Sequence, residues 1–543
     1  MSRYKSKLVI FLTAALVLGG AAGGAQAQSL PEIEGAYADF NDASGAISLI
    51  ESGLRDSYEG RTRSEWQRLQ QEAREQVLAG LKGLADGSLS PADRRAVEIM
   101  RGSLADAAED GSLAPVGKCE DAQRKDIDYA AMRVALYACF GALSNSLDFE
   151  GQKVTRVGAF DLLTRMNEPE RRKKLFMQFV PLWQAINGKS ERDSPYRRLI
   201  VMAAADARTR GSAIDDAAKT IGARTPEVEK WLEQILEAWR QASGDKQMEP
   251  WDYRYVGGST ERELGDAIAR EAMQPLNERY YRDLGAQLSA WDVIYDLDPR
   301  AGKAPLAYTD YVRRGRMRDD KWVPTLVRVS GNYAHGGLGL LNELVHENGH
   351  VVHMMALQTR PAFMDLGDAL FYEAFADVPS WSVYEPAWQQ KYLDRSSTEE
   401  SSLRALYSSV MLDVAWALFE ARMLREPTRD PNVVWTEITS KYLHVKPHPE
   451  LAWWLVRVQL VDAPGYMVNY GLGAVVTADI RQRIAEQIGP FTTGNERWFP
   501  WLSQHLLSSG QTQETAVLLR DFLGRPVSSQ PLLDEIARIK KKN

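Results

Sequence analysis

Apolar residues recur at every third or fourth position along most of the chain, a spacing typical of amphipathic helices. Ser90 and Pro91 form a helix start, and Pro169 begins another helix whose apolar stripe runs on to Leu182. A third helix begins at residues 225–227 and carries the apolar stripe Val228, Trp231, Ile235 and Trp239. The pattern predicts a mainly α-helical fold in which these large side chains belong to the core.

One segment departs from the helical pattern. Residues 325–330 alternate β-branched and other residues between Pro324 and Gly331, which predicts a short strand. A helix from about residue 338 to residue 358 follows it. We expect this small β element either to pair through its free edge with an extended peptide or simply to pack beside the helix.

The first residues have the pattern of an export signal. Basic residues up to Lys7 precede an apolar stretch at residues 8–22, and an A-x-A cleavage site ends at Ala27. The apolar stretch is short for a membrane span, and an uncleaved N-terminal anchor is the alternative. We expect residues 1–27 to be a removed signal peptide, and the protein to be periplasmic or secreted without stable membrane insertion.

Length, charge and cysteine content narrow the function classes. The chain has 543 residues and a formal net charge of −7, so it is long enough for two lobes and a poor candidate for nucleic-acid binding. Its two cysteines, Cys119 and Cys139, lack the C-x-x-C spacing of redox or metal motifs. In an exported protein they form either a disulfide or two reduced thiols.

The strongest chemical signal is the run His346-Glu347-Asn348-Gly349-His350, which matches the zinc-hydrolase motif H-E-x-x-H. Positions i and i+4 share one helix face, so both histidines can direct a ring nitrogen at one Zn²⁺. Glu347 would lie beside the open coordination position and act as general base toward a bound water. The motif predicts one catalytic zinc per chain with His346 and His350 as ligands.

A catalytic zinc needs a third protein ligand. The candidates are Asp365, Asp368, Glu373 and Asp377. Glu373 and Asp377 share a helix face, so one can bind the metal while the other accepts a hydrogen bond from a ligand histidine, and either assignment is open from the spacing alone. His353, nearly two turns after His346, either supports the site, lines the substrate site or packs in the core.

The developing oxyanion needs a hydrogen-bond donor besides the metal. Tyr466 and Tyr470 are the favoured donors, because they share a helix face and glycines beside them allow close backbone approach. His444 and His448 are nearby alternatives. A surface loop is the simpler interpretation of residues 447–449.

Several motifs resemble the thimet oligopeptidase and neurolysin family. Residues 346–353 are similar to its H-E-F-G-H-x-x-H helix, and residues 377–380 to its E-x-P-S segment. Residues 250–252 and 295–303 resemble its P-W-D and Y-F-D-L-Y-P-R-x-G-K motifs. Residues 465–470 resemble its G-Y-D-A-x-Y, whose tyrosines contact the substrate and the oxyanion.

A second resemblance selects the third ligand. Residues 373–377 are similar to the E-A-x-x-D segment of angiotensin-converting enzyme, which implies that Glu373 binds zinc and Asp377 supports a ligand histidine. The family resemblance implies a two-lobed helical metallopeptidase fold with a deep central channel and zinc at its floor. We place an N-terminal helical lobe at residues 28–250 and the zinc-binding catalytic lobe at residues 251–543.

The chain departs from the family pattern at three positions. Asn348 replaces a phenylalanine, Val461 replaces a histidine, and Gly473 aligns with the family's last tyrosine. The leading hypothesis is an exported zinc metallopeptidase that hydrolyses short peptides, because a channel excludes folded proteins. The alternatives are a zinc-binding but non-catalytic peptide-binding protein on the same scaffold, and a zinc hydrolase of another amide or ester.

Overall fold

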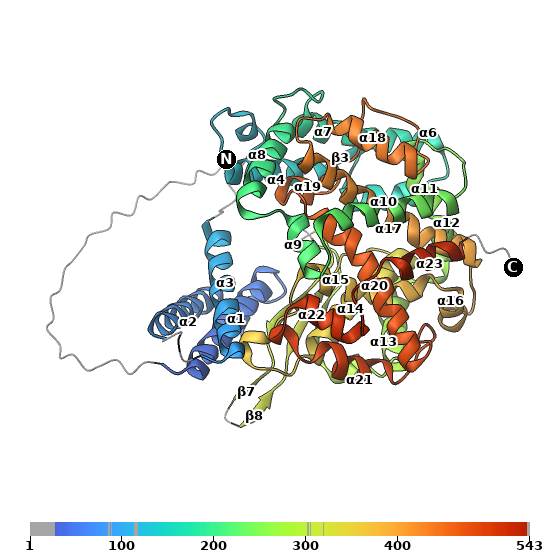
Figure 1. The fold of residues 1–543 in the computed structure, drawn as a ribbon. Coiled ribbons are helices and arrows are strands. Elements are labelled where there is room, and N and C mark those ends of the chain that lie inside the picture. Colours follow the sequence, from blue (N-terminus) through green and yellow to red (C-terminus); the bar gives the residue numbers. More distant parts are fainter. Residues whose placement is uncertain are drawn as a thin grey trace.

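The computed structural model describes residues 28–84, 87, 89–112, 118–300, 303, 306–318 and 320–539. The expected signal peptide, residues 1–27, lies outside them. Helices make up most of the described chain, with short strands between them (Figure 1), which confirms the expected mainly α-helical fold. None of the described helices is long and apolar enough to cross a membrane.

Three N-terminal helices share a small core of their own: α1 (Leu30–Glu51), α2 (Arg63–Gly83) and α3 (Pro91–Ser112). The hairpin of β1 (Ser57–Tyr58) and β2 (Arg61–Thr62) joins the first two. Their core includes Phe363 of the turn η7 (Pro361–Phe363), and Arg360 forms ion pairs with Glu34 and Asp93. These helices therefore pack on the second half of the chain. The lobe boundary at residue 250 stays a prediction.

The next helices gather in the upper part of Figure 1. They are α4 (Tyr129–Ser144), α5 (Arg156–Arg165), α6 (Pro169–Phe176), α7 (Val180–Asn187), α8 (Pro195–Arg210), α9 (Ala213–Thr220), α10 (Thr225–Ala242) and α11 (Tyr253–Gly257), with the hairpin β3 (Leu147–Phe149) and β4 (Gln152–Val154). A disulfide joins Cys119 to Cys139 of α4. The helix expected from Pro169 to Leu182 is divided after α6, because Pro181 in the first turn of α7 has no N–H and disfavours a continuous helix before it.

The small β element is a three-stranded sheet with the order β5 (Asp292–Asp296), β9 (Leu326–Ser330), β6 (Tyr308–Arg313). The predicted strand is β9, which runs parallel to β5 and antiparallel to β6. The expectation that this strand has a free edge is wrong, because both its edges are paired. The edge strand that contacts the motif helix is β6.

The motif helix is α14 (Leu338–Ala356), close to the predicted range, and it packs against α15 (Ala369–Ser380). A Cβ at Gly349 would lie 2.8 Å from Cα of Ala376 in α15. Glycine at this motif position therefore lets the two helices approach closely. On its other side α15 packs against α20 (Met467–Ile488).

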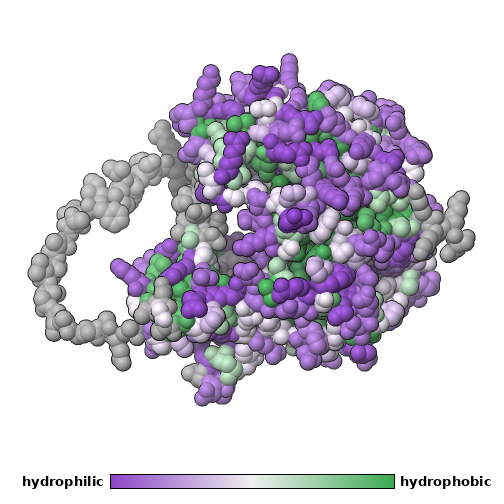
Figure 2. Space-filling view, in the orientation of Figure 1, coloured by the Kyte–Doolittle hydropathy of each residue, from purple (hydrophilic) through white to green (hydrophobic). Residues whose placement is uncertain are grey.

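The remaining elements complete the second half around one large apolar core. They are α12 (Ser259–Leu264), α13 (Arg270–Asp283), the hairpin β7 (Arg316–Arg318) and β8 (Lys321–Val323), α16 (Pro386–Leu393), α17 (Glu399–Arg425), α18 (Pro431–Tyr442), α19 (Gln459–Asp462), α21 (Trp498–Leu502), α22 (Thr515–Leu523) and α23 (Gln530–Arg538). Figure 2 shows a mostly hydrophilic outer face, as expected when the apolar side chains lie inside.

Candidate metal centre

Helices α14 and α15 bring three possible ligand atoms together. Nε2 of His346 lies 3.3 Å from Oε2 of Glu373, and Nε2 of His350 lies 3.9 Å from the same oxygen. The three atoms all lie within 4.8 Å of one another. Two imidazoles and one carboxylate are a known ligand set of catalytic zinc, with bonds of about 2.0–2.2 Å, so these residues fit the ion.

A carboxylate supports the first ligand. Oδ1 of Asp377 lies 2.8 Å from Nδ1 of His346, and such a contact fixes the ring so that Nε2 faces the metal. Burial lowers the pKa of His346, but Asp377 and Glu373 outweigh it and raise the pKa well above 6.5. A metal ion must therefore displace a proton from His346. Burial and the neighbouring His346 lower the pKa of His350 to about 3, so His350 is already neutral.

Glu347 is buried on the cavity side of α14. Oγ1 of Thr309, on β6, donates a hydrogen bond of 2.7 Å to its Oε2. Burial raises the pKa of Glu347 to about 7, against the lowering effects of His346 and Thr309. A carboxylate with a pKa near neutrality suits a general base that later returns its proton.

These groups line a cavity of about 600 Å³. Its walls come from α1, β6, α14 and α15, together with Tyr470 of α20. The lining residues of the first two elements are Asn41, Ser44, Gly45, Ser48, Tyr308, Thr309, Asp310 and Tyr311. The N-terminal helix α1 therefore forms a wall of the site, which the sequence did not predict.

Tyrosines lie beside the candidate ligands. Tyr470 lines the cavity, and its ring centroid lies 5.8 Å from that of Tyr466, which is outside the lining. Burial and the Glu373 carboxylate raise the pKa of both phenols, so each keeps its O–H as a donor. Tyr372, next to Glu373 in the sequence, also lines the cavity, with its ring centroid 5.6 Å from that of His350.

A buried carboxylate holds the turn that carries these tyrosines. Glu420 of α17 is fully buried and accepts hydrogen bonds from the backbone N–H groups of Gly465 and Met467, at 2.8 and 2.7 Å. Tyr466 lies between these two residues, and Tyr470 follows one turn along α20. The Glu420 side chain therefore fixes the start of α20. Sequence reasoning did not single out this residue.

The structure does not bring His353 to the ligands. Its ring packs between Phe371 and Phe375, at centroid distances of 5.5 and 5.2 Å. Burial lowers the pKa of His353 to about 3, and its Nδ1 has no hydrogen-bond partner among the described residues. His353 is thus neutral and lies between two phenylalanine rings, and it lines a separate hollow of about 190 Å³, outside the cavity of the candidate ligands.

Other candidates are engaged elsewhere. Nε2 of His444 lies 3.1 Å from the carbonyl oxygen of Arg240, and His448 lies between the carboxylates of Glu249 and Glu450. Two of the four third-ligand candidates also have other partners, since Asp365 pairs with Arg314 and Asp368 accepts a hydrogen bond from Thr515.

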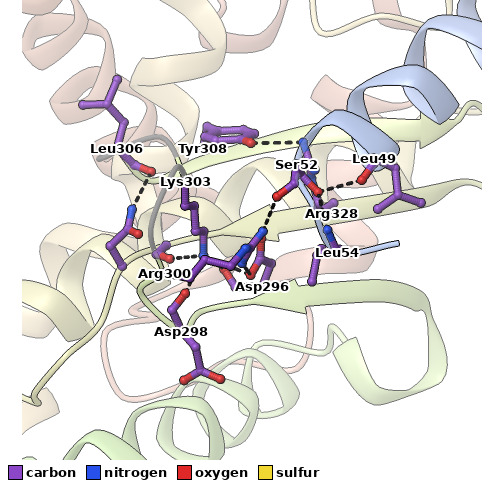
Figure 3. Close-up of polar contacts among 12 residues, drawn as sticks. Leu49, Ser52, Leu54, Asp296, Asp298, Arg300, Lys303, Leu306, Tyr308 and Arg328 are labelled. Atoms are coloured by element: carbon purple, nitrogen blue, oxygen red, sulfur yellow. Dashed lines mark hydrogen bonds and ion pairs between the residues drawn. The ribbon is translucent and has the colours of Figure 1, made fainter. Parts of the chain in front are cut away.

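Polar contacts hold α1 against the sheet beside the cavity (Figure 3). Arg300 forms an ion pair with Asp296 and donates to the carbonyl oxygen of Ser52, just after α1. The buried Arg328 of β9 donates to the hydroxyl of Tyr308, which lines the cavity. Part of the motif at residues 295–303 thus helps to position the α1 wall.

Sequence reasoning missed Thr309 and Tyr372. Tyr372 directly precedes Glu373 on the expected helix, so the sequence held a usable signal for its place beside the ligands. Thr309 lies on β6, a strand that we did not predict, and its sequence neighbourhood gave no comparable signal.

Comparisons with known proteins agree with this geometry. Residues 289–538 match the profile of peptidase family M3. No curated protein sequence matches the chain. The M32 carboxypeptidase from Deinococcus radiodurans R1 is 15% identical with a TM-score of 0.56, covering 94% of this chain and 98% of its own.

Two further solved structures share the fold. Trypanosoma cruzi metallocarboxypeptidase 1 is 13% identical with a TM-score of 0.52, covering 94% of this chain and 99% of its own. PZ peptidase A with inhibitor 2 is 14% identical with a TM-score of 0.54, covering 94% of this chain and 97% of its own. At these identities the likeness shows the fold.

Proposed function

We propose, on the premise that this chain belongs to a thimet oligopeptidase-like metallopeptidase family, that it is an exported zinc enzyme which hydrolyses short peptides. The observation that carries the proposal is the meeting of His346, His350 and Glu373 within 4.8 Å, in the same cavity as the buried Glu347. A Zn²⁺ ion held there would act as a Lewis acid and lower the pKa of a coordinated water toward about 7.

The chain's own residues supply proton transfer and orientation. Glu347, with a pKa of about 7, accepts a proton from the attacking water and gives it to the leaving amine. Thr309 holds this carboxylate in place through its hydrogen bond to Oε2. The phenol of Tyr470 keeps its proton and lines the cavity, which supports its role as a donor to the carbonyl oxygen of the scissile bond.

The position of strand β6 supports the proposal that the substrate is a peptide. Residues Tyr308 to Tyr311 of β6 line the cavity, and β6 is at the edge of its sheet. An extended peptide lying along this strand would gain main-chain hydrogen bonds whatever its sequence. A cavity of about 600 Å³ holds a few residues of such a peptide and excludes a folded domain.

The disulfide supports the exported location. Disulfides persist in oxidising compartments and are rare in the cytosol, and Cys119 is joined to Cys139. This pairing agrees with the signal-peptide pattern of residues 1–27.

Turnover of a quenched fluorescent peptide library tests the proposal. We expect wild type to cleave the library, and Glu347→Gln to keep one zinc per chain while losing activity by about 10²- to 10⁴-fold. Glu400→Gln, at the exposed start of α17, is the matched control and should cleave like wild type.

Two results would overturn the peptidase proposal. Zinc-loaded wild type that is as inactive as Glu347→Gln would favour a peptide-binding protein. Wild type that ignores peptides but cleaves a small ester or another amide in a Glu347-dependent way would make the protein a different zinc hydrolase.

A further inference from the structure

Three arginines interact with one another, and one of them contacts Tyr470, which lines the cavity. The guanidinium carbons of Arg156 and Arg254 lie 5.4 and 3.8 Å from the ring centroid of Phe160. That of Arg457 lies 5.8 Å from the ring centroid of Tyr470. We call Arg156, Arg254 and Arg457 the arginine cluster.

The cluster carries more positive charge than the chain neutralises. Arg457 forms an ion pair with Asp413 of α17. Among the described residues, no hydrogen bond or ion pair reaches the guanidinium of Arg156 or of Arg254, whose contacts are with the face of Phe160. Three cations thus share one carboxylate. Partly buried arginines without a carboxylate are unusual, because desolvation is costly unless an anion compensates for it.

The arginines act on one another electrostatically. Burial lowers the pKa of Arg254, and the neighbouring Arg457 and Arg156 lower it further. Burial and Arg457 likewise lower the pKa of Arg156. A guanidinium still stays protonated at neutral pH, so an anion placed among the three side chains would relieve both the desolvation and the repulsion.

The cluster adjoins the candidate metal centre. Tyr470 lines the cavity with Glu373 and contacts Arg457. Arg254 also lines a second hollow of about 230 Å³ with Leu340, at the start of α14. Arg457 therefore lies against a ring that lines the cavity, and Arg254 borders a second hollow.

We propose that Arg156, Arg254 and Arg457 form a binding site for a carboxylate of the peptide substrate, supplied by its C-terminus or by an acidic side chain. A guanidinium fork matches a carboxylate in a bidentate geometry and gives stronger hydrogen bonds than a neutral donor. The inference rests on the proposed function for its peptide. It adds that the enzyme prefers substrates with a negative charge on one side of the cleaved bond.

Kinetics on matched peptides tests the site. A peptide that wild type cleaves is compared as free acid and as C-terminal amide, and with glutamate or glutamine at each flanking position. We expect one of these carboxylates to raise kcat/KM by about tenfold or more. Arg254→Gln should abolish this difference in kcat/KM between charged and neutral peptides. The kcat/KM on the neutral peptides should change little. Dependence on the free acid identifies the C-terminus, and dependence on glutamate identifies a side chain.

Two further variants separate binding from folding. Arg156→Gln should lower the same ratio, and it serves if Arg254→Gln does not fold. Arg224→Gln removes an exposed arginine paired with Glu227 and should keep the ratio of wild type. Equal rates on all charged and neutral peptides would overturn the inference, as would arginine variants that slow every peptide alike and leave the ratio unchanged.

A binding measurement is independent of turnover. Zinc-loaded Glu347→Gln protein is titrated with acetyl-pentaalanine as acid and as amide, and with one alanine replaced by glutamate or glutamine. We expect tighter binding of one carboxylate form by about tenfold, lost when Arg254→Gln is added. If wild type cleaves no peptide but this preference holds, the proposed function fails and the carboxylate site stands. Equal affinities overturn the site.

Discussion

The pKa values of two carboxyl groups in the same site, Glu347 and Glu373, are shifted in opposite directions. Burial raises the pKa of both Glu347 and Glu373. For Glu347 burial dominates, and its pKa reaches about 7. For Glu373 the contacts with His346 and His350 outweigh burial and lower the pKa. One carboxylate is therefore able to exchange a proton near neutral pH, and the other stays ionised, as a metal ligand must be.

The Thr309 hydroxyl lowers the pKa of Glu347, the proposed general base, and its removal should shift the pH profile. Its hydrogen bond to Oε2 of Glu347 lowers the pKa of that carboxyl. Thr309→Val removes the bond and keeps the β-branched shape, so the pKa should rise by about 0.5–1 unit. The ionised base is lost as pH falls through this pKa, so the acid limb of kcat/KM should move to higher pH. Activity should fall more at pH 6 than at pH 8.

A distant threonine provides the control for this shift. Thr439→Val removes a buried hydroxyl that donates a hydrogen bond to the carbonyl oxygen of Trp435 within α18. This variant should leave the acid limb in place. An unmoved acid limb in Thr309→Val, with zinc content and folding intact, would show that Glu347 is not the group titrating in that limb.

Helix periodicity explains which residues of the candidate site could be predicted from the sequence. The spacings of His346 to His350 and of Glu373 to Asp377 are fixed by single helices, and the structure brings all four residues together. Thr309 comes from β6, and its place beside Glu347 depends on a tertiary contact that no local pattern encodes.

At the level of elements, the local sequence pattern predicted which helices and strands form better than it predicted which strands pair. The helix expected at residues 338–358 is α14, and the strand expected at 325–330 is β9. The free edge was wrong because β9 pairs with β5 and with β6. Alternating side chains reveal which faces are buried, but they do not reveal which strands lie on either side.

The close approach of α14 and α15 predicts the effect of a single methyl group. In Gly349→Ala the new Cβ would lie 2.8 Å from Cα and 3.0 Å from the carbonyl oxygen of Ala376. Backbone atoms cannot rotate away, so the helices must separate and carry Glu373 away from His346 and His350. We expect a loss of about 1–3 kcal/mol of unfolding free energy and weaker zinc binding, measured by denaturant titration and chelator competition.

An open helical glycine provides the comparison. A Cβ at Gly141 of α4 would meet no atom within 4 Å, so Gly141→Ala should be neutral or stabilising by up to about 1 kcal/mol. If Gly349→Ala bound zinc as tightly as wild type, the distance between the two helices would not control the ligand geometry.

For the molecule as a whole, the cavity joins the N-terminal helix to the middle of the sequence. Helix α1 provides one wall, while β6, α14 and α15 provide the others. The contact of Glu34 with Arg360 spans 326 residues, and no spacing rule reaches so far. The sequence could therefore predict the candidate ligands on α14 and α15, which the structure brings together, but not the wall formed by α1.

The ion pairs of Arg360 should control substrate binding through that wall. Arg360 links the buried Glu34 of α1 and Asp93 of α3 to the second half of the chain. Arg360→Met leaves Glu34 without this partner, which should lower the free energy of unfolding by about 2 kcal/mol, since Arg360 is partly exposed and screened. As α1 loosens, KM should rise by about threefold or more while kcat and zinc content stay near wild type, because binding is lost equally in the ground state and the transition state.

A surface ion pair of the same helical unit separates this effect from general charge loss. Arg68→Met breaks an exposed pair with Glu72 on α2 and should change stability by less than about 1 kcal/mol, with KM unchanged. If Arg360→Met lowered stability but left KM at the wild-type value, α1 would enclose the cavity without contacting the substrate. If it lowered kcat and zinc content instead, the N-terminal helices would act on the metal centre itself, and α1 would not be a substrate-binding wall.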